Sequence, residues 1–329
     1  MPHETAIVRD AAMILDDLLE KRLVFLSGKG GVGKSLVGAA LARAARDRGK
    51  TVLLVEVEAP MEAARYLGRP PVGDRVTEIE SGLHTVNLRP RGVMDEYVRH
   101  MLKVEILARR VIESPIYERF FAAAPGLKEL MVLGKIMVLE EGRSGLSRRP
   151  RYDLIVVDAP ATGHGLQFLK IPLAASKAVP VGPVGANARR ILALLRDPTR
   201  TALAIVAIPE EMAVVEASEL HRMATDEVGI TTCALVLNGC HERRLDPSEE
   251  AVVLKLSAEG AGGVLGPGVR LEAALAAARR HMRRRKLTRF YETRLKKRLP
   301  LPLVRLPYLF REEIGPAEVA LLAERLAAA

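Results

Sequence analysis

With 329 residues, 49% of them hydrophobic and 4% aromatic, the chain can form one large α/β domain or two smaller ones with aliphatic cores. Its formal net charge is +10, and its two cysteines, Cys233 and Cys240, form no Cys-x-x-Cys pair, which excludes a disulfide framework and a cysteine-based zinc site. No apolar run of about 18 residues and no signal-peptide core occurs, so we expect a cytoplasmic protein without a membrane span.

The first motif in chain order is a glycine-rich loop between a predicted strand and a predicted helix. Leu23 to Leu26 forms a short apolar run, Leu36 to Arg48 has a helical pattern, and Ser27-Gly-Lys-Gly-Gly-Val-Gly-Lys-Ser35 connects them. Such a connection points backbone N–H groups and a helix N-terminus at one place, where a phosphate chain can bind. Lys34 would contact the β- and γ-phosphates and Ser35 would bind Mg²⁺. The candidate cofactor-binding residues are Gly28, Gly30, Gly31, Val32, Gly33, Lys34, Ser35 and Leu36.

Apolar, β-branched runs alternate with helical stretches along the rest of the chain. Together with the first strand they predict about seven strands, the others at 51–56, 83–88, 153–157, 202–208, 231–237 and 303–306. Runs of this kind are typical of parallel strands that helices bury on both faces. We therefore expect an α/β fold, a mostly parallel, doubly wound sheet of the phosphate-loop NTPase type, with functional residues at the carboxyl ends of the strands.

One segment, residues 91–143, is too long for a simple crossover and predicts several helices. These helices would be inserted between two strands of the sheet. Four methionines (Met94, Met101, Met131 and Met137) are among its apolar positions. They fit either ordinary core packing or an adaptable surface for a hydrophobic client or partner.

A second segment, residues 257–298, combines a glycine-rich stretch with a basic helix. The stretch from Ser257 to Gly268 predicts a flexible linker. Arg279 to Arg298 holds eleven Lys and Arg residues against one acid, Glu292, with apolar residues near helical spacing. This basic amphipathic helix fits a solvated face, an acidic membrane surface or a nucleic-acid patch. Aromatic residues that could stack on bases are few, which argues against nucleic acid.

A second acidic motif follows the predicted strand at 153–157. Asp158 ends this strand, as expected of the carboxylate that coordinates Mg²⁺ in a phosphate-loop ATPase, so Ser35 and Asp158 are the candidate metal ligands. The loop from Ala159 to Pro172 is bounded by proline and glycine and could rearrange on hydrolysis as switch loops do.

These motifs resemble those of the arsenite-pump ATPase and tail-anchored-protein targeting ATPase family. The KGGVGKS form is similar to that group's deviant phosphate loop, and Asp158-Ala-Pro-Ala-Thr-Gly-His164 looks like its Asp-Thr-Ala-Pro-Thr-Gly-His signature. The resemblance covers most of the chain and implies a single ATPase domain over residues 1–329, with residues 91–143 as an inserted helical subdomain. It also implies an ATP- and Mg²⁺-dependent ATPase that works as a nucleotide-sandwich dimer. Lys29 would then cross the interface as an arginine finger does, unless it is a solvated surface lysine. Thr162, Gly163 and His164 are the implied switch residues, with His164 structural rather than a general base.

The same resemblance extends to the side of the site that binds the base. Asn238 matches the asparagine at a strand end that reads adenine in the family. Pro307 and Tyr308 lie in a stretch similar to its adenine-side loop, so they are implied base contacts.

Switch I departs from the family pattern. Where the family has Asp-Pro-Ala, this chain has Glu58-Ala59-Pro60, so Glu58 replaces the aspartate that positions the attacking water, and Glu56 stands two residues earlier on the same strand face. One extra methylene could slow hydrolysis about a hundredfold, so we expect slow ATPase activity.

The cysteines also depart from it. The zinc-binding Cys-x-x-Cys of the tail-anchored branch is replaced by Arg280-His-Met-Arg283, so no zinc is expected. The arsenite-pump branch joins two ATPase halves and binds the metalloid through cysteines of both. This chain corresponds to one half, with Cys233 in a predicted strand, which argues against arsenite efflux.

Two functions remain open. The chain is either a homodimeric ATPase that handles a hydrophobic or membrane-protein client, or a weakly active or inactive regulatory subunit that forms a heterodimer with a related ATPase chain. A ParA-like DNA-partitioning ATPase is disfavoured by the Thr-Gly-His of switch II.

Overall fold

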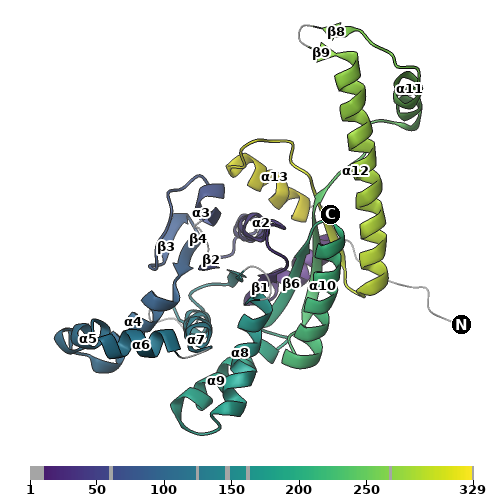
Figure 1. Cartoon of the computed structure of the whole chain (residues 1–329). Coiled ribbons are helices and arrows are strands. Elements are labelled where there is room, and N and C mark those ends of the chain that lie inside the picture. Colours follow the sequence, from purple (N-terminus) through teal and green to yellow (C-terminus); the bar gives the residue numbers. More distant parts are fainter. Residues whose placement is uncertain are drawn as a thin grey trace, which may run out of the picture.

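The computed structural model describes residues 11–58, 62–123, 126–144, 149–160, 164–266 and 269–327. They form an eight-stranded sheet with helices on both faces and a separate two-stranded ribbon (Figure 1). The order in the sheet is β10-β7-β6-β1-β5-β2-β4-β3. Its strands are β1 (Leu23–Ser27), β2 (Val52–Val57), β3 (Thr77–Glu80), β4 (Leu83–Leu88), β5 (Leu154–Asp158), β6 (Thr201–Ala207), β7 (Thr232–Cys240) and β10 (Leu303–Pro307).

The expected α/β fold with a mostly parallel sheet is confirmed. Seven strands run parallel at the seven predicted positions, and β3 joins the edge antiparallel to β4. This eighth strand was not predicted, because its sequence, Thr-Glu-Ile-Glu, is short and polar, as suits a largely exposed edge strand.

The parallel strands are buried on both faces. Along β1, Val24 and Leu26 pack on one face, while Leu23 and Phe25 pack on the other. The first face is covered by α1 (Ala11–Leu19), α2 (Lys34–Asp47), α3 (Glu62–Tyr66) and α13 (Pro316–Ala327). The second is covered by α7 (Leu127–Glu141), α8 (His164–Ala178), α9 (Gly182–Arg196) and α10 (Glu211–Met223), which the π-helix η1 (Ala224–Val228) extends. In sheets covered on both faces in this way, ligands bind at the carboxyl ends of the strands.

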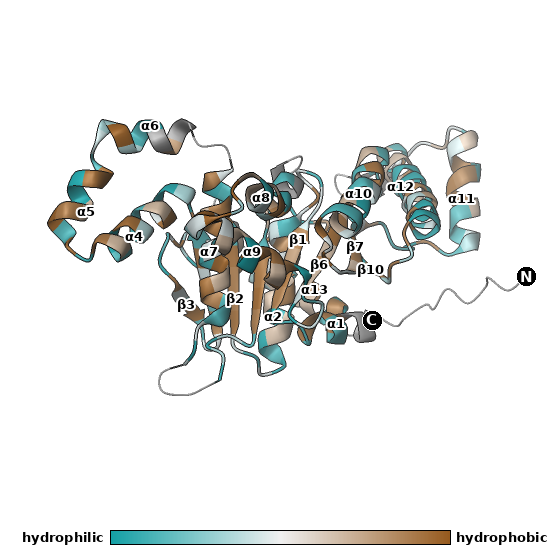
Figure 2. Cartoon of the chain, turned by 90° about the horizontal axis from the view of Figure 1, so that it is seen from below, coloured by the Kyte–Doolittle hydropathy of each residue, from teal (hydrophilic) through white to brown (hydrophobic). Residues whose placement is uncertain are grey.

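At one end of the sheet, α4 (Pro90–Leu102), α5 (Glu105–Ile112) and α6 (Pro115–Ala123) project from the body (Figures 1 and 2). Two of the four methionines of this region, Met94 and Met137, are buried, Met131 is half-buried, and Met101 is 60% exposed. The methionine pattern therefore belongs largely to the core.

A buried carboxylate anchors α7 to the sheet. Glu140 is 1% exposed, accepts a hydrogen bond from Nε of Arg22 at 2.5 Å and forms an ion pair with Arg200. Arg22 directly precedes β1 and Arg200 directly precedes β6, so the pair of guanidinium groups ties the last helix of the insert to two central strands.

At the other end of the sheet, α11 (Pro247–Ala258), β8 (Val264–Gly266), β9 (Val269–Arg270) and α12 (Leu271–Arg298) form a projecting arm (Figure 1). The segment expected to be a flexible linker contains the end of α11 and the strand β8, which pairs with β9 beyond it. The basic segment lies within α12, whose carboxyl-terminal end packs on the core through Leu295. Among the helices described, none has the length and apolar character needed to cross a membrane.

Candidate functional site

The glycine-rich loop lies at the carboxyl end of β1, whose neighbours in the sheet are β5 and β6. Its first glycine, Gly28, lies against β6, because a Cβ atom there would be 2.0 Å from the carbonyl oxygen of Val206. Its last glycine, Gly33, caps α2 with a φ of 85°, a left-handed conformation that glycine adopts at little cost. These constraints bring the loop's backbone N–H groups and the N-terminus of α2 together, which suits a bound anion.

Lys34 is a buried cation at the start of α2. Its Nζ atom donates hydrogen bonds to the carbonyl oxygens of Gly28 and Lys29, each at 3.2 Å. Burial lowers the pKa of Lys34, and the nearby carboxylates of Asp158 and Glu216 oppose that shift. A partly dehydrated ammonium group attracts an anion more strongly than a solvated one, so this lysine is suited to a phosphate.

Ser35 and Asp158 meet beside the loop, as the sequence predicted. The Ser35 hydroxyl donates to Oδ2 of Asp158 at 2.5 Å, and Asp158 is 4% exposed at the end of β5. Strand register places Asp158 opposite Leu26 of β1 and Glu56 of β2. Two neighbouring oxygen ligands of this kind fit Mg²⁺, which usually takes one or two protein oxygens together with phosphate oxygens and water.

The two switch I glutamates have different environments. Glu56 is 1% exposed, and its Oε1 atom accepts the N–H of Ala63 at 3.0 Å, which ties the end of β2 to α3. Glu58 is exposed, with a φ of 50° that is uncommon for a residue other than glycine. Its side chain lines a cavity of about 300 Å³ together with Arg89, Arg91, Lys128 and other residues of the insert side. Glu58 and the phosphate loop therefore line different cavities.

Of the predicted switch II residues, Thr162 and Gly163 lie outside the described residues. His164 is the first residue of α8, and its side chain is likewise outside the description.

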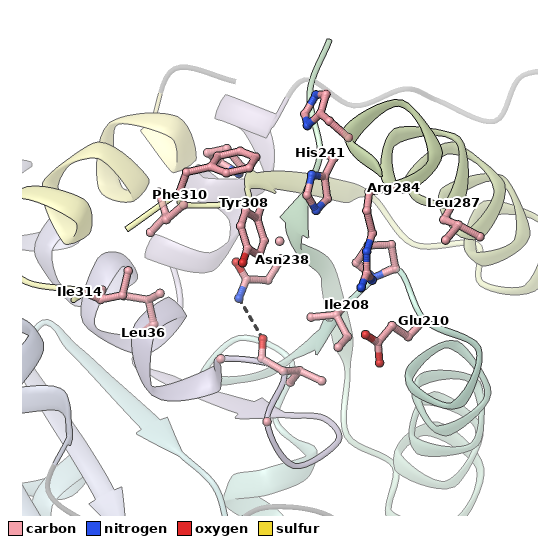
Figure 3. A pocket seen from close by; sticks show the side chains of 18 of the residues that line it. Leu36, Ile208, Glu210, Asn238, His241, Arg284, Leu287, Tyr308, Phe310 and Ile314 are labelled. Carbon is pink, nitrogen blue, oxygen red and sulfur yellow. Dashed lines mark hydrogen bonds between the residues drawn. The ribbon is translucent and has the colours of Figure 1, made fainter. Parts of the chain in front are cut away.

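The base-side residues converge on one cavity of about 690 Å³ beside the loop (Figure 3). Gly31, Val32, Gly33, Leu36, Asn238, Pro307 and Tyr308 all line it. The Asn238 side chain donates from Nδ2 to the carbonyl oxygen of Val32 at 2.9 Å, which leaves its Oδ1 atom as an acceptor. The Tyr308 ring stacks on that of His241, with centroids 4.7 Å apart. An acceptor beside a stacking surface is suited to a heterocyclic base with an exocyclic amino group.

Lys29, the second lysine of the loop, does not line this cavity. Its side chain is 33% exposed, and its Nζ atom lies 3.9 Å from Oε1 of Glu216 on α10. It is thus a partly exposed group next to α10.

Several residues that line the cavity were not identified from the sequence. They are His241 and Phe310 near the base-side strands, Glu210 before α10, and Arg280, His281, Arg284 and Leu287 of α12. The position of His241, three residues after Asn238 on the same strand end, was a usable signal. For α12 there was none, because a helical pattern does not reveal which distant loop the helix will contact.

The parallel sheet, the phosphate loop after its central strand and the acidic residue at the end of the adjacent strand define a phosphate-loop nucleoside triphosphatase. A family model described as anion-transporting ATPase matches residues 21–181. ATPase BagA of Mycobacterium tuberculosis is 31% identical over 266 residues, which cover 77% of this chain and 76% of that protein.

Two further relatives agree with this match. An arsenical pump-driving ATPase of Escherichia coli is 27% identical over 233 residues (66% of this chain, 39% of that protein), and ATPase GET3 of Malassezia globosa is 25% identical over 250 residues (65% of this chain, 71% of that protein). The chain belongs to the anion-transporting ATPase family, which confirms the resemblance inferred from its motifs.

Proposed function

We propose that this chain binds ATP and Mg²⁺ at the phosphate loop and hydrolyses ATP as one subunit of a dimer. The observation that carries the proposal is the convergence of buried Lys34 and the Ser35–Asp158 pair beside the loop that follows β1. The loop's N–H groups and Lys34 hold the phosphates, and Ser35 and Asp158 hold Mg²⁺. The metal, when bound, neutralises charge that develops on the phosphate oxygens.

Asn238, Pro307 and Tyr308 bind the adenine in this proposal. The Asn238 carbonyl oxygen accepts from the exocyclic amino group, because its own amide is already committed to Val32. Pro307, the last residue of β10, and Tyr308, which follows it, flank the base on one side of the cavity.

Lys29 acts on the nucleotide of the partner subunit. Its ion pair with Glu216 is long, at 3.9 Å, and partly exposed, so giving it up costs about 1 kcal/mol. The side chain is therefore available to cross a dimer interface and stabilise charge at the transferred phosphate, as an arginine finger does.

The insert binds a hydrophobic client in our proposal, such as a segment of a membrane protein. Eight large hydrophobic side chains along α4 to α6 are at least 38% exposed: Tyr97, Met101, Leu102, Val104, Ile106, Leu107, Val111 and Ile116. Hydrophobic residues occur along all three helices (Figure 2), and this many exposed apolar side chains support an interaction surface here.

Client binding is tested with the double variant Met101→Asp/Ile106→Asp. Both side chains are more than half exposed, so the fold tolerates the change, whereas Met137 is 2% exposed and unsuitable. Capture of a fluorescent hydrophobic helix by the variant should be lost while ATP binding is retained. Val252→Asp, which places the same charge on an exposed apolar position of α11, is the control. Undiminished capture by the double variant would contradict a client surface on α4 and α5.

The two cysteines do not support an arsenite-binding role. Burial raises the pKa of the Cys233 thiol to about 11 and that of Cys240 to about 12, so neither is a thiolate near neutral pH. Both are free thiols, in keeping with the reducing cytoplasm that we propose as the location.

One observation favours a regulatory subunit as a second candidate function. Glu58, in place of the family's aspartate, lines the insert-side cavity with a left-handed backbone instead of the cavity beside the loop. If Glu58 keeps this conformation when ATP binds, its carboxylate would not hold the attacking water at the γ-phosphate. The chain would then bind ATP and turn it over only when paired with a related ATPase chain.

Steady-state ATP turnover as a function of protein concentration separates the two functions. Specific activity that rises with concentration and is lost in Lys29→Ala supports a self-sufficient homodimer. Tight ATP binding with negligible turnover at every concentration supports the regulatory subunit. Absence of ATP binding would refute both.

A further inference from the structure

One wall of the 690 Å³ cavity comes from the basic helix α12. Arg280, His281, Arg284 and Leu287 line it, at positions that share one face of the helix. Figure 3 shows Arg284 and Glu210 on one side of the cavity and Leu36, Phe310 and Ile314 on the other. Residues far apart in the chain thus surround a single space.

The two arginines of this wall differ from others of α12. Arg285 and Arg294 form ion pairs with glutamates, but no carboxylate among the described residues pairs with Arg280 or Arg284. Their guanidinium groups are exposed and border the cavity, so they are available to a ligand.

An aromatic cluster lies next to them. Tyr308 stacks on His241 with an interplanar angle of 15°, and Phe310 meets Tyr308 edge to face at 4.9 Å. His281 of α12 contacts the His241 ring, with centroids 5.4 Å apart. Flat rings and planar guanidinium groups around one space are suited to stacking on a heterocyclic base.

The phosphates do not compete for this space. Lys34, Ser35 and Asp158 are not among the residues that line the cavity, although Gly31 to Gly33 of the loop are. A nucleotide whose phosphates lie at Lys34 therefore extends past Asn238, with its base and sugar between Tyr308 and α12.

We propose that α12 is part of the nucleotide site and that Arg280 and Arg284 bind the base and ribose of the bound nucleotide. This inference rests on the proposed ATP binding at the phosphate loop. Its consequence is that the arm of α11, β8, β9 and α12 responds to nucleotide occupancy. By linkage, any partner that binds the arm changes nucleotide affinity by the same factor as the nucleotide changes affinity for that partner.

Titration calorimetry of the full chain with ATP and with inorganic tripolyphosphate tests the proposal. In Arg280→Ala/Arg284→Ala, ATP affinity should fall on the order of tenfold, as two lost guanidinium contacts imply, while tripolyphosphate affinity is unchanged. Arg284→Lys keeps the positive charge but removes the planar guanidinium group, so its ATP affinity should fall by part of that amount. Arg279→Ala/Arg283→Ala removes two exposed charges of α12 that do not line the cavity and should match the wild type.

Four results would overturn the proposal. Equal ATP affinity in the Arg280/Arg284 variant and the wild type would show that α12 does not contact the nucleotide, and an equal loss for tripolyphosphate would show only a long-range charge effect. Wild-type protein that binds tripolyphosphate but not ATP would also overturn it, and protein that binds neither would remove the proposed function along with it. Amide hydrogen exchange adds a second readout, since ATP should slow exchange in 279–290 of the wild type but not of the Arg280/Arg284 variant.

Discussion

Gly28→Ala should displace the phosphate loop and sharply reduce ATP turnover. Carbon and oxygen approach no closer than about 3.3 Å, whereas an ideal Cβ at Gly28 would lie 2.0 Å from the Val206 carbonyl oxygen, so the loop must retreat by about 1.3 Å. The obstacle is backbone of the central strand β6, which cannot rotate aside as a side chain can. The carbonyl oxygen of Gly28 also accepts a hydrogen bond from Lys34, so the displacement moves the phosphate-binding lysine as well.

The magnitude follows from this displacement. Misplacement of catalytic groups by about 1 Å costs about a hundredfold in rate, and overpacking of a rigid site costs about 1–3 kcal/mol of unfolding free energy. We expect turnover of Gly28→Ala to fall about a hundredfold and its urea midpoint to fall by a corresponding amount.

Gly49→Ala is the matched control. Gly49 has a φ of 81° just after α2, with nothing within 4 Å of the added methyl group. Left-handed strain should cost about 1–2 kcal/mol there without moving the loop. The two variants should therefore lose comparable stability, but only Gly28→Ala should lose turnover and ATP binding. Wild-type turnover in Gly28→Ala, or an equal loss in Gly49→Ala, would refute the contact argument.

Three further predictions concern the anchor of α7, switch I and the base side. Glu140→Gln removes the buried charge that pairs with Arg22 and Arg200. Because both arginines are partly exposed and can rehydrate, the free energy of unfolding should fall by about 1–3 kcal/mol. An unchanged urea midpoint would contradict this. Glu58→Asp should raise steady-state turnover, by up to about a hundredfold, with ATP affinity unchanged if chain length limits water positioning; slower turnover would contradict it. Burial and the nearby cations lower the pKa of His241 below its ordinary value of 6.5, so the unfolded chain binds more protons just below that pH and stability should fall as the pH decreases from 6.5. Urea midpoints of His241→Gln should lack this part of the decrease, and equal slopes for the two proteins would contradict it.

The sequence by itself determined the parallel strands, the phosphate loop and the pairing of Ser35 with Asp158. Strands buried on both faces must be continuous apolar runs, and the loop is a contiguous stretch whose glycines are needed for local backbone conformations and close contacts. The location of the Asp158 carboxylate near the phosphate loop follows from its place at the end of a strand, because parallel strands bring their carboxyl ends to one edge of the sheet.

Only the tertiary structure decided which faces of the helices meet other parts of the chain. Helical spacing shows that a face is apolar or basic but not what covers it, so Met101 and Met137 were equivalent in sequence, although one is exposed and the other is core. The motif placed Glu58 next to the nucleotide, whereas its left-handed backbone and its position in a cavity lined by insert residues became visible only in the structure. Arg284 lines the cavity beside the phosphate loop, although it lies about 250 residues after that loop in the sequence. This placement depends on how α12 packs in the fold, and no local sequence pattern encodes such a long-range interaction.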